Sequence, residues 1–128
     1  MGISDNKKRV LSLDKKRFKT YLGYIKGIFS YHIFKKEFNE PLYYKNNVAY
    51  IDFITTLVEA RGNNVARTLL KILLEDKRYS EFILEVGDTN NIALNLYTKM
   101  GFEEFDRKTE KYPKQTGFNE RIFMKFKY

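Results

Sequence analysis

The sequence predicts an α+β fold with a mixed, mostly antiparallel central sheet and flanking helices. An apolar, β-branched segment at 48–58 is typical of a central strand that is covered on both faces. Apolar residues then recur at helical spacing from about 64 to 77. A second short apolar segment follows at 81–86. Strand, helix and strand in this order predict a parallel pair of strands that is joined by a right-handed crossover.

The segments before residue 48 predict a hairpin and a loop. Aromatic and β-branched residues at 17–24 and 28–34 are typical of two strands, and Ile25-Lys26-Gly27 separates them. The segment 35–47 contains Pro41 and reads as a connecting loop.

The C-terminal part predicts one helix and two closing strands. The helix spans 90–101, with Asn90 as its N-cap and Gly101 as its C-terminal stop. Strands at 102–108 and 121–128 then enclose a polar loop. The complete predicted order is β-β-β-α-β-α-β-β.

Composition limits the chemistry that this chain can perform. With 128 residues, of which 43% are hydrophobic, residues 1–128 are expected to form one domain with a substantial core. The absence of cysteine excludes disulfides, zinc–thiolate sites and a cysteine nucleophile. A single histidine, His32, makes a histidine-rich metal site unexpected, so we predict no metal cofactor.

Location and charge suggest the kinds of partner. No apolar run approaches the length of about 18 residues that spans a bilayer, and residues 1–17 lack the apolar segment of a secretory signal. We therefore expect a cytoplasmic protein without a membrane partner. The net charge is +8, with the basic excess at the two ends of the chain and a mildly acidic middle. A basic surface favours anionic partners, but it is also common on ordinary solvated surfaces.

The turn after the segment 48–58 has features of a phosphate-binding site. Its sequence, Arg61-Gly62-Asn63-Asn64-Val65-Ala66, leads directly into the predicted helix. The first amide N–H groups of a helix have no intrahelical partners, and the helix dipole favours an anion there. Asparagine tolerates the left-handed region and also caps helices. The turn is therefore either a phosphate cradle or an ordinary turn with an asparagine cap.

A second motif favours the cradle. The residues from Asn90 follow N-x-x-A-x-x-L-Y-x-K-x-G-F, with Ala93, Tyr97 and Gly101 at fixed spacing. Together with the turn at 61–66, this motif resembles the GNAT superfamily of acetyl-CoA-dependent N-acetyltransferases. In that family an R/Q-x-x-G-x-G/A turn follows the fourth strand, and the asparagine motif follows the fifth. The resemblance covers about residues 48–107 and implies a GNAT-like acyltransferase fold that uses acetyl-CoA as cosubstrate and an amine as acceptor.

The resemblance also implies roles for individual residues. The backbone of Leu57 and Val58 would hold the pantetheine arm, and the turn at 61–66 would wrap the pyrophosphate. Asn64 replaces a family glycine, and we expect it to cap the helix while serving the phosphate turn. The implied cofactor-binding residues are Leu57, Val58, Arg61, Gly62, Asn63, Asn64, Val65, Ala66, Asn90 and Tyr97.

Without cysteine, acyl transfer requires direct attack of the amine on the thioester. Tyr97 is the candidate acid for the departing thiolate, or else a packing residue of its helix. Asp52, in an otherwise apolar strand, either activates a water as a base or pairs with a neighbouring lysine. Glu59 is expected to orient Arg61, and Glu85 and His32 are weaker candidates on strands.

The N-terminal region departs from the family pattern. Family members usually begin with a strand and two helices that form one wall of the acceptor site, whereas only about 17 residues precede the first predicted strand here. We therefore expect an abbreviated N-terminus and a homodimer that covers the exposed edge of the strand 17–24. The alternative is a catalytically inactive domain of the same fold that binds CoA, nucleic acid or an acidic protein. Nucleic acid is the less expected partner, because the aromatic residues do not interleave with the lysines.

Overall fold

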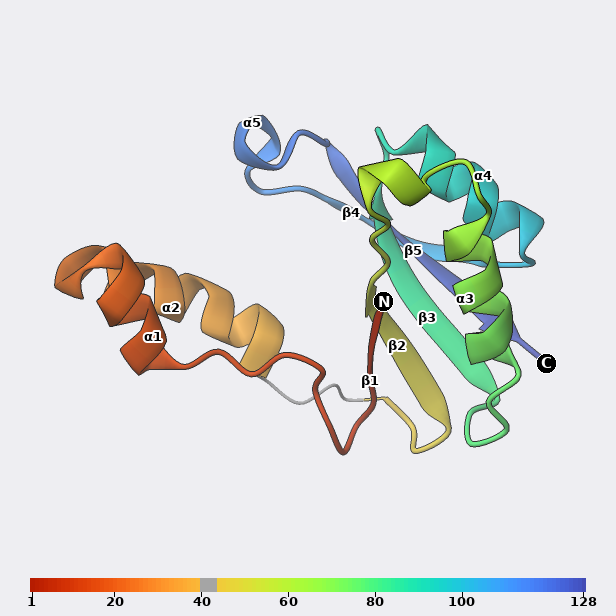
Figure 1. Ribbon diagram of the computed structural model, residues 1–128, viewed down its shortest axis with the longest axis horizontal. Coiled ribbons are helices and arrows are strands. Elements are labelled where there is room, and N and C mark those ends of the chain that lie inside the picture. The colour runs from red at the N-terminus through yellow and green to blue at the C-terminus, as the bar shows by residue number, and fades with distance from the viewer. Residues whose placement is uncertain (40–43) are drawn as a thin grey trace.

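A computed structural model describes residues 1–39 and 44–128 of the chain (Figure 1). The strands are β1 (Gly2–Ser4), β2 (Val48–Phe53), β3 (Glu81–Gly87), β4 (Glu103–Thr109) and β5 (Glu120–Lys127). The helices are α1 (Lys15–Leu22), α2 (Tyr24–Asn39), the 3-10 turn η1 (Val58–Ala60), α3 (Val65–Leu74), α4 (Asn91–Lys99) and α5 (Pro113–Thr116).

The five strands form one mixed sheet in the order β1-β2-β3-β5-β4. Strands β2 and β3 are parallel, with Val48 opposite Glu81 and Ile51 opposite Leu84. The other three pairings are antiparallel. Helix α3 connects the parallel pair, because parallel neighbours require a crossover connection. The predicted fold class, a mixed and mostly antiparallel sheet with flanking helices, is confirmed.

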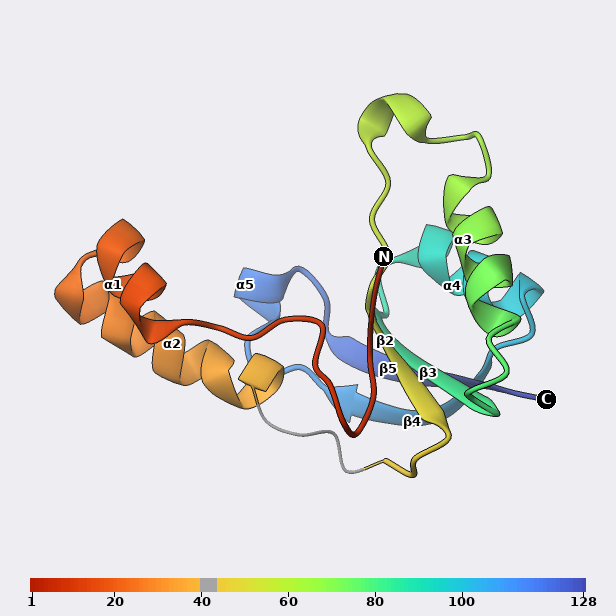
Figure 2. The ribbon, with the colours of Figure 1, turned by 60° about the horizontal axis from the view of Figure 1, so that its bottom comes forward.

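The main core lies between the sheet and helices α3 and α4, which Figure 2 shows on the same side of the sheet. Leu70, Leu73 and Leu74 of α3 are buried, and their spacing of three and four residues places them on one helix face. Phe82 of β3 and Phe102 after α4 are fully buried beneath these helices. The opposite sheet face carries a smaller cluster of Val48, Tyr50 and Ile83.

The predicted hairpin of strands at 17–24 and 28–34 is wrong, because these residues form the helical pair α1 and α2. Asp14 caps α1 by accepting a hydrogen bond of 2.8 Å from the Lys16 N–H group. Gly23 ends α1 with a φ of 78°, which a residue with a side chain rarely adopts. These two local signals outweigh the strand propensity of the aromatic residues between them.

Gly27 does not form the hairpin turn that the sequence suggested, but lies in α2 where the helix packs against α1. A Cβ atom at this position would lie 2.5 Å from the Phe18 carbonyl oxygen, so only glycine lets α2 approach α1 this closely. The rings of Phe18 and Tyr31 also meet edge to face across the two helices, with 6.1 Å between their centroids. Helix α2 extends to Asn39, so the predicted loop at 35–47 is partly helical, and Pro41 lies outside the described residues.

Other elements end earlier than predicted. Strand β2 stops at Phe53, and the residues that were expected to continue it to position 58 lead instead into η1. Helix α3 ends at Leu74 rather than at 77, and α4 ends at Lys99. The short strand β1 and the single turn α5 were not predicted.

The N-terminal part contains a strand and two helices, so the expectation that these elements are absent is wrong. Fewer strands precede the turn at 61–66 than in the family pattern. Among the described residues this turn follows β2, the second strand, whereas the family pattern places it after the fourth. Helices α1 and α2 pack on each other and project away from the sheet (Figures 1 and 2). Because residues 17–24 form no strand, the edge that was expected to drive dimer formation does not exist.

Candidate functional site

The central parallel pair opens at its C-terminal end. Pairing between β2 and β3 stops at Ile51 and Leu84, although β3 continues to Gly87. The edge of β3 that faces β2 therefore has unpaired backbone groups from Glu85 onward. Two cavities lie at this opening, and Ile54, Asn90 and Tyr97 line both of them.

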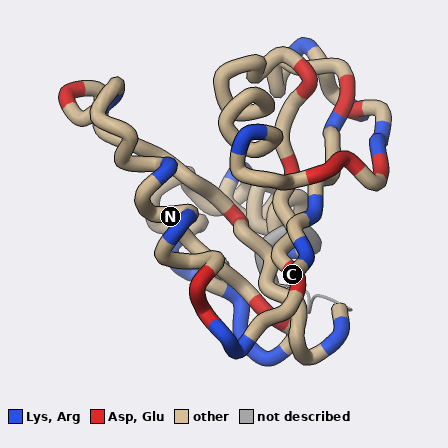
Figure 3. Tube along the Cα trace, turned by 90° about the vertical axis from the view of Figure 1, so that its right-hand side faces the viewer, with Lys and Arg blue, Asp and Glu red and all other residues tan. Residues whose placement is uncertain are grey.

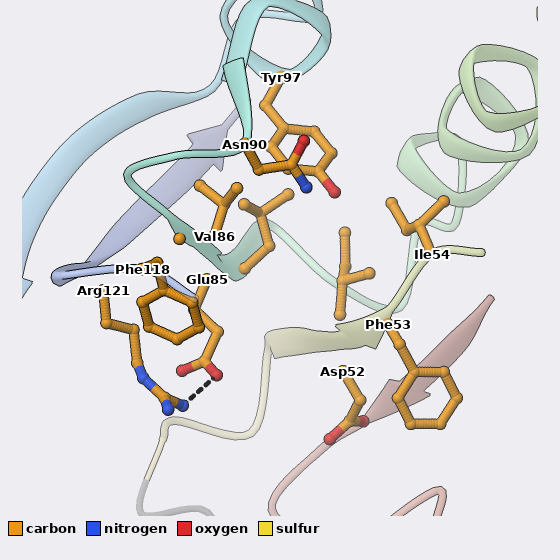
Figure 4. Close-up of a pocket in the computed structure, with 12 residues that line it drawn as sticks. Asp52, Phe53, Ile54, Glu85, Val86, Asn90, Tyr97, Phe118 and Arg121 are labelled. Atoms are coloured by element: carbon orange, nitrogen blue, oxygen red, sulfur yellow. Dashed lines mark hydrogen bonds and ion pairs between the residues drawn. The ribbon is translucent and has the colours of Figure 1, made fainter. Parts of the chain in front are cut away.

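The first cavity, called the inner cavity here, has a volume of about 380 Å³ and lies between the ends of β2 and β3 (Figure 4). Its lining combines apolar walls with three charged groups. The lining residues are Ile51, Asp52, Phe53, Ile54, Leu84, Glu85, Val86, Gly87, Asn90, Tyr97, Phe118 and Arg121.

The second cavity, called the turn cavity here, has a volume of about 650 Å³ and lies between the turn before α3 and the start of α4. Its lining combines two arginines with uncharged polar and apolar residues. The lining residues are Ile54, Thr55, Thr56, Ala60, Arg61, Gly62, Asn64, Val65, Ala66, Arg67, Asn90, Ile92, Ala93, Leu96 and Tyr97.

The turn before α3 needs two residues in the left-handed region. Gly62 has a φ of 80° and Asn64 a φ of 56°, and Asn64 is the one non-glycine residue with positive φ in the described part of the chain. Asn64 occupies the N-cap position, but its side chain makes no capping hydrogen bond, so the expectation that it caps the helix is wrong. Asparagine is present because it tolerates this backbone conformation better than other residues with a side chain.

The start of α3 presents hydrogen-bond donors and positive charge to the turn cavity. Its first internal hydrogen bond runs from the Thr68 N–H group to the Asn64 carbonyl, so the preceding amides of the first turn lack intrahelical acceptors. Arg61 and Arg67 both line the cavity, and the first turn contains no acidic residue. The helix dipole disfavours a cation in this turn, and Arg67 was not among the predicted site residues.

Asn90 and the N-terminus of α4 form the other wall of the turn cavity. Asn90 is the N-cap that the sequence predicted, and its Oδ1 accepts a hydrogen bond of 3.2 Å from the Ala93 N–H group. Tyr97 lies two helical turns later on the same face, and Figure 4 shows its ring beside Asn90 with the hydroxyl toward the cavity. Tyr97 is 8% exposed, and burial raises the pKa of its hydroxyl. The phenol is therefore held in its protonated form.

Asp52 points into a polar cluster on the N-terminal segment. Its carboxylate accepts a hydrogen bond of 2.5 Å from the Ser4 hydroxyl and pairs with Arg9 at 3.3 Å. The predicted pairing with a lysine is thus a pairing with an arginine. Burial raises the Asp52 pKa, while Ser4 and Arg9 act to lower it. Figure 4 places Asp52 on the opposite side of the inner cavity from Tyr97.

Glu85 and Arg121 form a second charged pair in the inner cavity, drawn as a dashed line in Figure 4. Arg121 donates from Nη1 to Glu85 Oε1 at 2.6 Å and from Nη2 to Glu110 Oε2 at 2.9 Å. Tyr50 also donates a hydrogen bond to Glu85, and its pKa is raised by burial and then by this carboxylate. Arg121 and Phe118 were not predicted as site residues, because they follow a loop that matches no motif.

Within residues 1–39 and 44–128, none of the helices has the length and hydropathy of a membrane span. The same residues contain no group of three or more His, Asp or Glu side chains that could hold a metal ion. Basic and acidic residues are interspersed along much of the trace in Figure 3.

Comparison with known proteins identifies the family of this chain. A model of the acetyltransferase (GNAT) family matches residues 5–102, which is well over half of the chain. The chain belongs to the GNAT acetyltransferase family. No match was found among curated protein sequences.

Solved structures support the GNAT fold. The ribosomal-protein-S18-alanine N-acetyltransferase from Escherichia coli is 27% identical with a TM-score of 0.58, over 63% of this chain and 54% of that one. The ribosomal-protein-alanine N-acetyltransferase from Brucella melitensis is 22% identical with a TM-score of 0.60, over 70% and 56%. A GNAT family acetyltransferase from Elizabethkingia anophelis with acetyl-CoA bound is 16% identical with a TM-score of 0.57, over 66% and 63%. The present chain therefore spans between 54% and 63% of the length of these three structures.

The GNAT motif positions do not all reach the cavities. Leu57 and Val58 are 78% and 68% exposed, and neither lines the turn cavity. Asn63 also lies outside its lining, whereas its neighbours Gly62 and Asn64 belong to it. The cause is the early end of β2, since residues 54–57 leave the sheet before the turn.

The weaker site candidates Glu59, His32 and Glu85 also differ in whether they line one of the two cavities. Glu59 is exposed in η1, and within the described residues no ion pair joins it to Arg61. His32 lies on helix α2 rather than on a strand, with its ring 5.7 Å from that of Tyr31. Of these candidates only Glu85 lies in a cavity.

Proposed function

We propose that this GNAT protein is an N-acetyltransferase that transfers an acetyl group from acetyl-CoA to a primary amine. The observation that carries the proposal is the meeting of two cavities at Asn90 and Tyr97. One cavity is lined by a helix N-terminus and two arginines, and the other lies between two strands and combines apolar walls with charged groups. A long anionic cosubstrate and a small acceptor would meet at this junction.

The turn cavity suits the phosphate end of acetyl-CoA. Amide groups at the start of α3 would donate to the pyrophosphate, and Arg61 and Arg67 would supply positive charge. The pantetheine arm would extend along the open edge of β3, whose backbone groups beyond Leu84 have no partner on β2. The thioester would then lie at the junction of the two cavities.

The chemical step needs one nucleophile and one acid. The amine nitrogen attacks the thioester carbonyl and forms the new C–N bond, and the C–S bond breaks as the tetrahedral intermediate collapses. Tyr97 would donate its proton to the leaving thiolate, because its raised pKa keeps the hydroxyl protonated. The nitrogen releases a proton to water in the cavity, and the tyrosinate regains its proton from the same source.

We propose that the amine attacks as the free base and that Asp52 has a positioning role. Both oxygens of Asp52 have partners, namely Ser4 and Arg9, and the carboxylate lies across the cavity from Tyr97. Asp52 would instead anchor β1 and the following segment to β2. No metal ion takes part in this scheme.

The decisive experiment measures binding and turnover separately. Thermal unfolding of the full chain with millimolar CoA should show an increase in melting temperature. Release of CoA from acetyl-CoA should then depend on an added primary amine, and mass spectrometry should show the acetylated amine. Stabilisation by CoA without transfer to any amine would support the inactive CoA-binding domain instead. No stabilisation at all would remove the basis of the proposal.

A further inference from the structure

The connection between α1 and α2 carries large apolar side chains that are exposed to solvent. Tyr21 and Ile25, on either side of Gly23, are 83% and 81% exposed. The direct neighbours of Gly23, Leu22 and Tyr24, are exposed as well. Residues 21–25 are called the apolar tip here. Figures 1 and 2 place it at the end of the helical pair that lies farthest from the sheet.

The packing of the helical pair leaves the side chains of the apolar tip exposed. The two helices meet where Gly27 approaches Phe18 and where the Phe18 ring packs against Tyr31. Neither the inner cavity nor the turn cavity is lined by residues 21–25. Exposed apolar groups that gather in one place are unfavourable in water and mark sites of interaction. The apolar tip is therefore available to a partner.

Positive charge accompanies the apolar tip. Between positions 15 and 35 the chain has no Asp or Glu, and its basic residues are Lys15, Lys16, Arg17, Lys19, Lys26 and Lys35. The Lys19 Nζ atom lies 4.5 Å from the centroid of the Tyr24 ring, and Lys26 follows Ile25 directly. A lysine keeps its ammonium group in a polar layer while its stem lies against apolar surface. Apolar side chains next to lysines are typical of segments that lie at a lipid interface.

Charge and shape favour an anionic lipid surface over other partners. A second copy of the chain would bring the same lysines against the tip, and like charges repel each other. A folded protein would need a pocket that fits a protruding tip, whereas a lipid layer is fluid and needs no matched shape. Anionic headgroups attract basic residues, and tyrosine prefers the boundary between the apolar and the aqueous layer. The composition of the tip therefore matches an anionic membrane.

We propose that the apolar tip binds the surface of a membrane that contains anionic lipids. Tyr21, Leu22, Tyr24 and Ile25 would enter the boundary between headgroups and acyl chains, and the flanking lysines would contact the lipid phosphates. This contact needs no spanning segment, whose lack led to the expectation of a protein without a membrane partner. The inference goes beyond the proposed acetyl transfer and does not depend on it.

Co-sedimentation of the full chain with vesicles tests the inference without any turnover. One set of vesicles contains phosphatidylcholine alone, and the other contains equal parts of phosphatidylcholine and the anionic phosphatidylglycerol. The partition coefficient should be at least about tenfold higher for the anionic vesicles, because each basic residue near the surface adds attraction. High salt should reduce the difference, because it screens the charges. Equal binding to both kinds of vesicle, or binding to neither, would overturn the inference.

Two double variants separate the apolar from the charged contribution. Leu22→Ser with Ile25→Ser removes apolar surface from the tip, and Lys19→Gln with Lys26→Gln removes the flanking charges. Each double variant should lower the partition coefficient on anionic vesicles at least about tenfold. Full binding by both variants would show that another surface makes the contact, and the inference would be rejected.

Matched controls come from exposed residues outside the helical pair. Ile72→Ser is the apolar control, since Ile72 is 63% exposed on α3, and Lys114→Gln on α5 is the charge control. Both controls should bind the anionic vesicles as wild type does. Losses in the controls as large as those at the tip would show a general effect of the surface and contradict a specific role of residues 21–25.

A fluorescent reporter tests the contact independently of the folding of the serine variants. The chain has no tryptophan, so Tyr24→Trp introduces a single one at the tip, and Tyr112→Trp introduces a single one next to α5 as the control. Emission should move to shorter wavelength with anionic vesicles for Tyr24→Trp alone. A shift for Tyr112→Trp alone would assign the contact to another surface. Light scattering that shows a dimer, together with a failure to bind vesicles, would assign the tip to a second copy and overturn the inference.

Discussion

Gly87 of β3 packs so closely against Phe118, in the loop after α5, that no side chain fits at position 87. A Cβ atom at Gly87 would lie 2.7 Å from Phe118 Cγ. Both residues line the inner cavity, and their contact fixes one of its aromatic walls.

The first prediction follows from this contact. Gly87→Ala should displace the Phe118 ring and destabilise the fold by about 1–3 kcal/mol, as overpacking of a tight contact does. Because the ring belongs to the inner cavity alone, KM for the amine should rise severalfold while the dissociation constant for CoA stays constant. Steady-state kinetics and CoA titration check the two parts, and an unchanged amine KM would contradict the role given to this wall.

The second prediction concerns the left-handed residue before α3. Asn64→Val places a β-branched side chain at a φ of 56° and should destabilise the protein by about 1–2 kcal/mol. Asn64→Gly should instead be tolerated, since glycine adopts this conformation freely. Asn63→Val is the matched control and should change stability by less than about 0.5 kcal/mol, as exposed substitutions usually do. Thermal unfolding of the three variants measures the differences, and equal losses at 63 and 64 would refute the conformational explanation.

The third prediction tests the phosphate contacts. Arg61→Ala and Arg67→Ala should each weaken CoA binding by about tenfold, which corresponds to about 1.4 kcal/mol. The loss should shrink at high salt, because exposed charges are screened. Lys71→Ala, on the last turn of the same helix, should leave CoA affinity unchanged. Titration calorimetry at two salt concentrations measures all three variants. Equal effects at Lys71 would show that only general surface charge matters.

The fourth prediction concerns Tyr97 and pH. Tyr97→Phe should lower kcat about 100-fold with little change in CoA affinity, because only the proton donor is removed. Burial raises the Tyr97 pKa above its usual value of 10.0, so the wild-type rate should not decline up to pH 10. A rate that falls between pH 8 and 9.5 in wild type, or a Phe variant with full activity, would reject Tyr97 as the acid.

The fifth prediction separates a positioning role of Asp52 from a catalytic one. Asp52→Asn should keep kcat within about threefold of wild type, since we assign no proton transfer to this residue. The folded-state pKa of Asp52 is raised, so its contribution to stability is full below pH 3.8 and is lost as pH rises through the raised value. The melting temperature of wild type relative to Asp52→Asn should therefore fall from pH 3 to pH 7. A relative rise would show that the Arg9 pair outweighs burial.

The parts of the fold that the sequence predicted correctly carry strong local signals. Asn90 caps α4 because its side chain reaches the amide three residues later, and a motif of fixed spacing marks that helix. Burial of β2 and β3 on both faces gives them the apolar runs that identified them. Residues 17–34 were assigned wrongly because their aromatic side chains resemble those of strands. The capping contact at Asp14 and the close approach at Gly27 override that propensity.

The candidate site was predictable only where it follows a motif. Gly62 and Asn64 could be placed from the turn pattern, since the backbone requires positive φ there. Arg121 reaches the inner cavity through the antiparallel pairing of β5 with β3, a contact between residues far apart in sequence. No single-sequence pattern encodes such a pairing, so Arg121 and its bridge to Glu85 became visible only in three dimensions.

The position of β1 has a consequence for the order of folding. Strand β1 contains three residues and pairs with β2 across almost fifty positions of chain, whereas β4 and β5 pair with each other across the short connection that contains α5. Closing a long loop costs entropy before the contact contributes any energy, so the C-terminal half is expected to form the folding nucleus. The N-terminal strand then joins last and opens first. Hydrogen exchange should accordingly be fastest at β1 among the strands, while the amides of β3 and β5 exchange only through global unfolding.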